Sequence, residues 1–136
     1  MAVRVEIAYE GSLRCGAVHG PSGTRIETDA PTDNMGKGER FSPTDLVATA
    51  LGSCMLTTMA IVAERNGIPF DQARVSVEKH MTTAPPRKIA ELTTVIELPA
   101  SFTPEQRTKL EHAAKACPVH KSLDHDVAMP IEFRYV

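Results

Sequence analysis

The feature that most constrains the fold is a long, weakly polar segment that predicts a single helix over residues 43–66. Ser42-Pro43-Thr44-Asp45 supplies a hydroxyl N-cap, a proline at the first helical position and an acidic residue that suits the helix dipole. Apolar side chains recur at helical spacing up to Val62, and Gly67 is a natural C-terminal stop. The predicted helix is about 36 Å long. Because so few of its side chains are charged, we expect it to be buried on more than one side.

Shorter elements are predicted on both sides of this helix. Thr103-Pro104-Glu105-Gln106 combines a capping box with a proline at the first helical position, which predicts a second helix ending at Cys117. Residues 30–40 are rich in Pro, Gly and Asp and predict a long loop, while Pro118 opens a short turn over 119–123. Strands are predicted, mainly from period-two alternation, at 3–9, 13–18, 24–29, 74–81, 91–98 and 131–135. This order of elements predicts an α+β fold.

Composition favours one compact domain over residues 1–136. Hydrophobic residues make up 42% and charged residues 24% of the 136 residues, values that are ordinary for a globular domain. The net charge of −2 and the absence of Trp exclude nucleic acid as an expected partner. Apolar runs are short, so we expect no membrane partner. The N-terminus lacks the apolar stretch of a signal peptide, so we expect a cytoplasmic protein.

The candidate chemistry lies in three cysteines, Cys15, Cys54 and Cys117. An odd count fits a reducing compartment better than a disulfide scaffold. Cys54 falls on the apolar stripe of the long helix, where an inert core thiol is the simpler interpretation. Cys117 precedes Pro118 and either caps the following turn, where free N–H groups favour a thiolate, or ends the core stripe of the second helix. Since both helices share one core, packing could bring Cys54 and Cys117 together.

The sequence pattern narrows these alternatives. The segment from Phe41 to Cys54, with Ala116-Cys117-Pro118-Val119 downstream and Tyr9-Glu10-Gly11 near the start, resembles the OsmC/Ohr family of osmotically inducible and organic-hydroperoxide-resistance proteins. The resemblance implies an OsmC-like fold of antiparallel strands around a long central helix. It also implies an intertwined homodimer and thiol-dependent reduction of peroxides, mainly organic hydroperoxides.

The resemblance also implies roles for the two late cysteines. Cys54 would attack the peroxide and become a sulfenic acid, and Cys117 would resolve it as a disulfide. A small dithiol or a lipoyl-type donor would reduce that disulfide, and the cycle needs no metal or organic cofactor. The sequence departs from the family at Thr44, where the family has a Glu that pairs with an Arg. We therefore take Glu39 as the substitute acid and Arg14 or Arg40 as the cation, against the alternative that all three are solvated loop charges.

Two other functions stay open. Cys117 and His120 form a C-x₂-H pair, and Cys15 and His19 form a C-x₃-H pair, which together could hold zinc. Alternatively, the chain is a non-catalytic binding module that keeps the fold and its hydrophobic cleft. We expect Cys15 to be an ordinary strand residue. The histidines expected to be exposed or hydrogen-bonded are His112, His120 and His125.

Overall fold

The structure is a computed structural model that describes all residues from 1 to 136, and their contacts divide the chain into two compact units. The N-terminal unit is Met1–Leu46 and the C-terminal unit is Val47–Val136. The boundary falls inside the long helix α1 (Pro43–Arg65), so the first turn of this helix belongs to one unit and the rest to the other. A single domain over residues 1–136 therefore stays a prediction.

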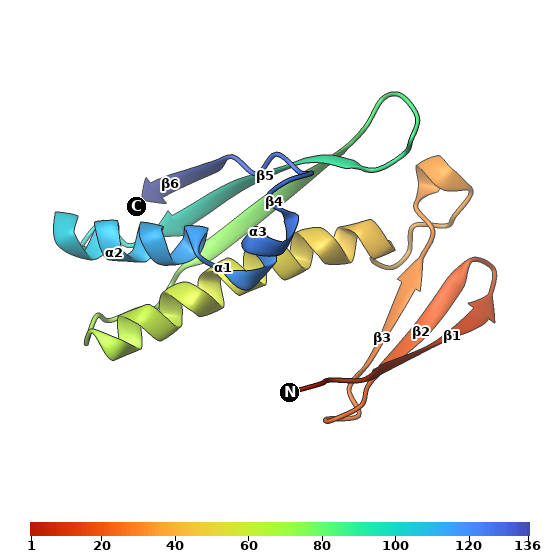
Figure 1. Cartoon of the computed structure of the whole chain (residues 1–136), viewed down its shortest axis with the longest axis horizontal. Coiled ribbons are helices and arrows are strands. Elements are labelled where there is room, and N and C mark those ends of the chain that lie inside the picture. The colour runs from red at the N-terminus through yellow and green to blue at the C-terminus, as the bar shows by residue number, and fades with distance from the viewer. The chain divides into compact units, whose positions relative to one another are not determined.

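The N-terminal unit is an antiparallel sheet in the order β1-β2-β3 (Figure 1). Its strands are β1 (Val5–Gly11), β2 (Arg14–His19) and β3 (Arg25–Asp29), each within one or two residues of the predicted limits. The predicted loop over 30–40 is confirmed and contains one short 3₁₀ turn, η1 (Thr32–Asn34).

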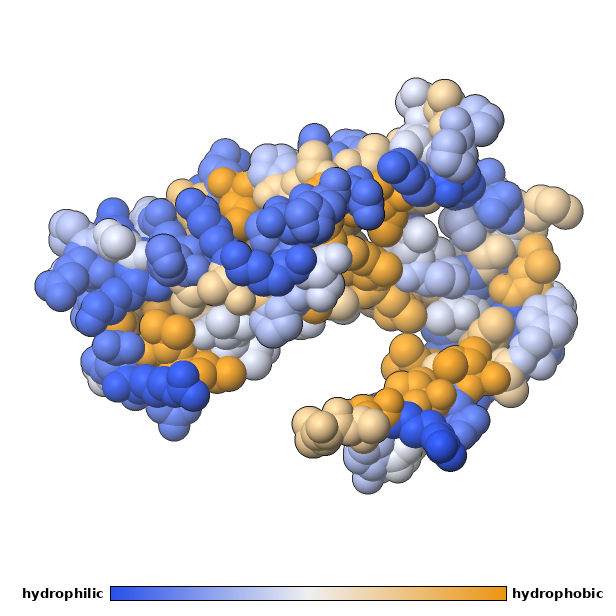
Figure 2. Space-filling model, viewed as in Figure 1, coloured by the Kyte–Doolittle hydropathy of each residue, from blue (hydrophilic) through white to orange (hydrophobic).

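One face of this sheet is apolar and uncovered. The register places Ile7, Ala17 and Ile26 directly opposite one another on that face, with Val5 and Tyr9 beside them. The four large side chains of the set are 46% to 67% exposed, and Figure 2 shows hydrophobic surface, in orange, over the N-terminal strands. Exposed apolar patches of this kind mark surfaces that another molecule covers.

The C-terminal unit packs three helices on a mixed sheet in the order β4-β5-β6. Its strands are β4 (Arg74–Met81), β5 (Ile89–Leu98) and β6 (Ile131–Tyr135). The expectation of antiparallel strands is wrong for β6, which runs parallel to β5. The cause is the crossover between them, through α2 (Pro104–Lys115) and α3 (Pro118–Leu123), which returns the chain in its original direction.

Both predicted helix starts are confirmed. Ser42 Oγ accepts a hydrogen bond of 3.1 Å from the Asp45 N–H, and the Asp45 carboxylate accepts one of 2.9 Å from the Ser42 N–H. Thr103 and Gln106 form the same reciprocal capping box at α2. However, α2 ends at Lys115 and not at Cys117, because a residue that precedes proline is disfavoured in the helical conformation.

Helix α1 is buried along one side only. Leu51, Met55 and Met59 are fully buried and belong to the core cluster of the C-terminal unit. The expectation of burial on more than one side is therefore wrong for a single copy of the chain. An exposed stripe runs along the other side of the helix and consists of Thr49, Ser53, Thr57 and Ile61. This stripe is a second uncovered surface of the protein.

By length and composition alone, α1 would also qualify as a membrane span. An 18-residue window has a mean hydropathy of 1.9, and 33% of that window is buried inside the protein. Core helices of globular proteins reach the same values. The complete burial of Leu51, Met55 and Met59 against the sheet and α2 identifies α1 as such a core helix.

Gly52 allows α1 to lie close to β4. A Cβ at this position would lie 3.1 Å from Val75 Cγ1 and 3.1 Å from Val77 Cγ2. We expect Gly52→Val to lower the free energy of unfolding by about 1–3 kcal/mol, because its methyl groups force the helix and strand apart. Urea denaturation measures the change. Glu64→Val places the same side chain at an exposed position of α1 and should have little effect; equal losses in the two variants would contradict the steric explanation.

Candidate functional site

Cys54 and Cys117 lie together in the C-terminal unit. Cys54 is half-buried on α1 and packs against the core cluster that contains Cys117. The two thiols are close enough for a hydrogen bond and a Coulomb interaction to act between them, and both are reduced. Packing of the helices thus brings together two residues that are far apart in the sequence.

Cys117 is the more protected thiol. Its side chain is 0% exposed, and it is the N-cap of α3, as one of the two sequence alternatives predicts. The His120 N–H donates a hydrogen bond of 3.3 Å to Cys117 Sγ. Burial raises the pKa of Cys117, and the hydrogen bond to Cys54 raises it further, while the N–H groups of His120 and Val119 lower it. The net direction is upward, so the expectation that capping would favour a Cys117 thiolate is wrong: burial outweighs the donated hydrogen bonds.

Cys54 is the accessible thiol of the pair. It lies at the edge of the buried side of α1, one residue before Met55. Its Sγ is 4.0 Å from Thr58 Oγ1, one helical turn further on. A small molecule can therefore reach Cys54 from solvent, whereas Cys117 faces only protein.

The predicted cation Arg14 belongs to a charged cluster in the N-terminal unit. Arg14 Nε donates to Asp29 Oδ1 over 2.7 Å and Nη2 to Oδ2 over 2.9 Å, a bidentate pair. Nη2 also donates to Glu39 Oε1 over 3.3 Å, and the Glu39 N–H donates to Asp29 Oδ2 over 3.1 Å. The Asp29 side chain is 3% exposed, and its hydrogen bonds with Arg14 lower the pKa of this carboxyl. The same bonds raise the pKa of Arg14.

Asp29 is the charged residue that the sequence interpretation missed. The register pairs it directly with Arg14 across β2 and β3. The predicted strands at 13–18 and 24–29 already contained this signal, because the short turn between them aligns the start of one strand with the end of the other. Arg40 lies at the edge of this cluster: its Nη1 donates to the Glu39 carbonyl oxygen over 3.1 Å, and its Nε lies 3.3 Å from Glu27 Oε1 in an exposed pair. Such pairs contribute little to stability.

The remaining candidates are less informative, with one exception. Cys15 lies half-buried on β2 opposite Tyr9, as expected for a strand residue. The structure brings together no group of three or more His, Cys, Asp or Glu side chains that could hold a metal ion, so the zinc interpretation gains no support. His112 and His125 are exposed. His120 is different: its Nδ1 is buried without a hydrogen-bond partner, so the expectation of a surface or satisfied histidine is wrong.

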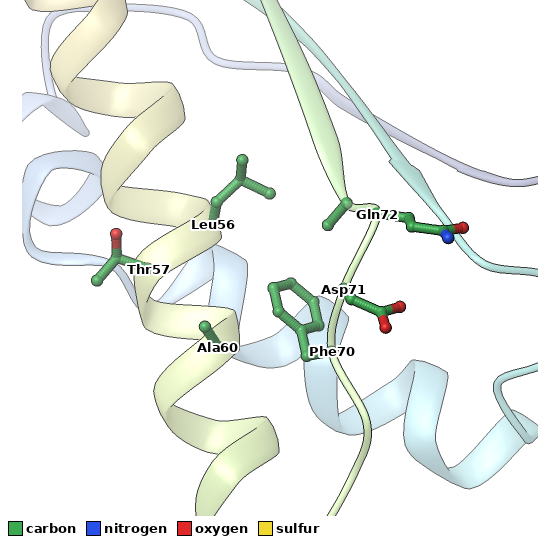
Figure 3. A pocket seen from close by; sticks show the side chains of 7 residues that line it. Leu56, Thr57, Ala60, Phe70, Asp71 and Gln72 are labelled. Atoms are coloured by element: carbon green, nitrogen blue, oxygen red, sulfur yellow. The ribbon is translucent and has the colours of Figure 1, made fainter.

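Two surface pockets lie beside α1. One of about 290 Å³ lies between α1 and the segment before β4, and Figure 3 shows the Phe70 ring facing the helix there while Asp71 and Gln72 point away. The other, of about 540 Å³, lies between α1 and α2; Lys109 Nζ and Asn66 Oδ1 form a 3.2 Å hydrogen bond at its edge. Neither pocket is lined by Cys54 or Cys117, so the expected hydrophobic cleft at Cys54 is not one of them.

Comparison with known proteins identifies one family by sequence and by structure. The family model for OsmC-like protein matches residues 36–132. No curated protein matches the chain. A solved protein of Psychrobacter arcticus, named for osmotic-stress induction and a detoxification response, is 39% identical; the match covers 95% of this chain and 93% of that chain, with a TM-score of 0.89.

More distant structures share the fold. An organic hydroperoxide resistance protein OsmC from Legionella pneumophila is 13% identical, covers 98% of this chain and 97% of that chain, and gives a TM-score of 0.79. The organic hydroperoxide resistance protein OhrB of Bacillus subtilis is 18% identical, covers 98% of each chain and gives a TM-score of 0.73. At these identities the likeness is one of fold.

The unequal exposure of the two thiols leads to a labelling prediction. In the native, reduced protein we expect iodoacetamide to modify Cys54 well before Cys117, because Cys117 is fully buried and its pKa is raised. Peptide mass spectrometry after timed quenching measures both rates. In denaturant the two rates should converge. Equal rates in the native protein would show that Cys117 is not protected as the structure indicates.

Proposed function

Because the chain belongs to the OsmC-like protein family, we propose that it is a thiol-dependent peroxidase that reduces organic hydroperoxides. Family membership and the names of the neighbouring structures support a peroxidase-like role at the level of the family. The observation that carries the specific proposal is the meeting of two reduced thiols of unequal exposure, Cys54 and Cys117.

In the proposed cycle, the Cys54 thiolate attacks one oxygen of the hydroperoxide. The O–O bond breaks, an alcohol leaves, and Cys54 becomes a sulfenic acid. Cys117 then attacks the sulfenic sulfur, the S–O bond breaks, and a disulfide and water form. A dithiol or lipoyl-type reductant returns both residues to thiols by exchange. No metal or organic cofactor takes part in these steps.

The surroundings of the two thiols suit this division of roles. A resolving thiol should stay protonated and shielded until the sulfenic acid has formed, and burial of Cys117 provides both conditions. A peroxidatic thiol must be reachable, and Cys54 is half-buried. Disulfide closure needs the two Cα atoms to lie about 4.4–6.8 Å apart. The structure therefore favours Cys54 as the attacking residue.

Of the two predicted cations, Arg14 is the one with two acidic partners in the N-terminal unit. Arg14 is held rigidly by Asp29 and Glu39, which supply the acidic partner that Thr44 does not. Arg40 is an exposed residue that pairs with Glu27.

We also propose that the protein is located in the cytoplasm, because three free cysteines suit a reducing compartment.

The cycle can be tested with reduced protein and two peroxides. Cumene hydroperoxide should be consumed faster than hydrogen peroxide, with formation of a Cys54–Cys117 disulfide that mass spectrometry maps. Cys117→Ser should complete one turnover and then stop with a sulfenic acid at Cys54 that dimedone traps. Cys15→Ser is the matched control and should turn over normally. Continued turnover by Cys117→Ser would remove the resolving role, and no reaction with either peroxide would favour a non-catalytic binding module.

We also propose that the protein is a homodimer. One apolar surface, the sheet face around Ile7, is uncovered in one copy, and so is the exposed stripe of α1, which consists of Thr49, Ser53, Thr57 and Ile61. Ile7→Glu should shift the protein from dimer to monomer in analytical ultracentrifugation, because it places a charge on a face that the second copy would bury. Glu6→Gln, on the opposite face of β1, is the control and should leave the dimer intact. A wild-type monomer would overturn the proposal.

A further inference from the structure

A surface pocket of about 540 Å³ lies between α1 and α2, and neither Cys54 nor Cys117 lines it. Binding sites for small molecules have volumes of about 300–1,000 Å³ and combine apolar walls with a few polar groups. The pocket before β4 is smaller, at about 290 Å³, and its lining includes the acidic Asp71 but no cationic side chain. Of these two, only the pocket between α1 and α2, hereafter the α1–α2 pocket, has the volume of a typical ligand site.

Alkyl side chains form the apolar part of the α1–α2 pocket. Val62 on α1 is half-buried and packs against the core cluster, Ala113 on α2 is buried in that cluster, and Ala116 is exposed. The hydroxyl of Thr108, another lining residue, donates to the Pro104 carbonyl oxygen over 3.0 Å and is thus satisfied within its own helix. These lining residues offer hydrocarbon surface to a ligand and carry no charge.

The charge of the α1–α2 pocket comes from Lys109. Its Nζ donates to Asn66 Oδ1 over 3.2 Å, and Asn66 Nδ2 donates to the Val62 carbonyl oxygen over 2.8 Å, so both ends of this amide are held. No Asp or Glu lines the pocket, and the Asn66 amide is the one partner of the Lys109 ammonium within the chain. Because an ammonium group has three N–H donors, two of them stay open to a ligand.

His112 supplies a further donor on the same helix. It is exposed, lines the same pocket and forms no hydrogen bond or ion pair within the chain. A neutral imidazole has one N–H donor and an imidazolium has two, so the ring can donate to an anion in either protonation state. Residues three apart on a helix share one face, so Lys109 and His112 can approach an anion from the same side.

We propose that the α1–α2 pocket binds a small monocarboxylate with a hydrocarbon tail. The carboxylate accepts hydrogen bonds from Lys109 and His112, and the tail lies against Val62, Ala113 and Ala116. One fixed positive charge matches a carboxylate better than a phosphate ester, which carries nearly two negative charges at neutral pH. Contact of the tail with alkyl side chains is favourable because it removes apolar surface from water. The proposal does not depend on the peroxidase cycle.

Octanoate is the probe for this site. Titrated at neutral pH into isotope-labelled protein, it should shift the amide NMR resonances of the pocket residues more than any others. Two ligands with the same tail serve as controls: 1-octanol has no charge, and octylammonium has the opposite charge. Both should bind at least about five-fold more weakly than octanoate, because neither forms an ion pair with Lys109. Isothermal titration calorimetry measures the three affinities.

Substitutions separate the charge of the pocket from its shape. Lys109→Met keeps a long side chain without charge and should weaken octanoate binding about five-fold, with no effect on 1-octanol. Lys115→Met makes the same change at an exposed position of α2 that does not line the pocket, and it should leave both affinities unchanged. Ala116→Phe places a ring in the pocket and should weaken binding of both ligands.

The possible results are distinct. Equal affinity for octanoate and 1-octanol, or equal losses in the two lysine variants, would overturn the proposal, because Lys109 would then not recognise the carboxylate. Shifts centred on residues outside the pocket would also overturn it. Pocket resonances that respond to protein concentration and not to octanoate would assign this surface to a second copy of the chain. Urea denaturation of each variant establishes that it is folded before affinities are compared.

Discussion

The one-sided burial of α1 determines where the chemistry can occur. Leu51, Met55 and Met59 form a ridge that is fully buried in the core of the C-terminal unit. Successive residues of a helix are rotated by about 100°, so Cys54 lies beside this ridge and not on it. One side of its thiol therefore meets the core, where Cys117 is buried, and the other side stays open. A shift of the ridge by one residue would bury Cys54 or expose it entirely.

The Cys117-Pro118 step is a second, local constraint with chemical consequences. Proline ends α2 early and begins α3, which makes Cys117 a cap and turns its sulfur inward. Two effects then oppose each other at the thiol: N–H donors lower its pKa and burial raises it. Burial is the larger effect because the helix is short and its cap is fully enclosed. The result is a thiol that is held in place, is shielded from solvent and has a raised pKa.

Local signals predicted much of this molecule. The caps at Ser42 and Thr103 depend on residues within a few positions of one another, and both are present in the structure. The resemblance carried by Cys54 and Cys117 identified the family. The spacing of the two cysteines in the sequence did not by itself predict that they would lie together in the fold. What the sequence could not specify depends on long-range pairing. The parallel direction of β6 follows from the crossover path. The role of Asp29 was missed although the short turn between the two predicted strands already placed it near Arg14. The isolation of His120 Nδ1 depends on how its surroundings pack.

The bare face of β1, β2 and β3 has a thermodynamic consequence. The C-terminal unit has a buried core, whereas the N-terminal sheet leaves its largest apolar side chains exposed to water. Whatever covers that face adds its binding free energy to the sheet by mass action. The heat stability of the sheet then rises with the concentration of the covering molecule. Dilution alone would lower the temperature at which the sheet melts.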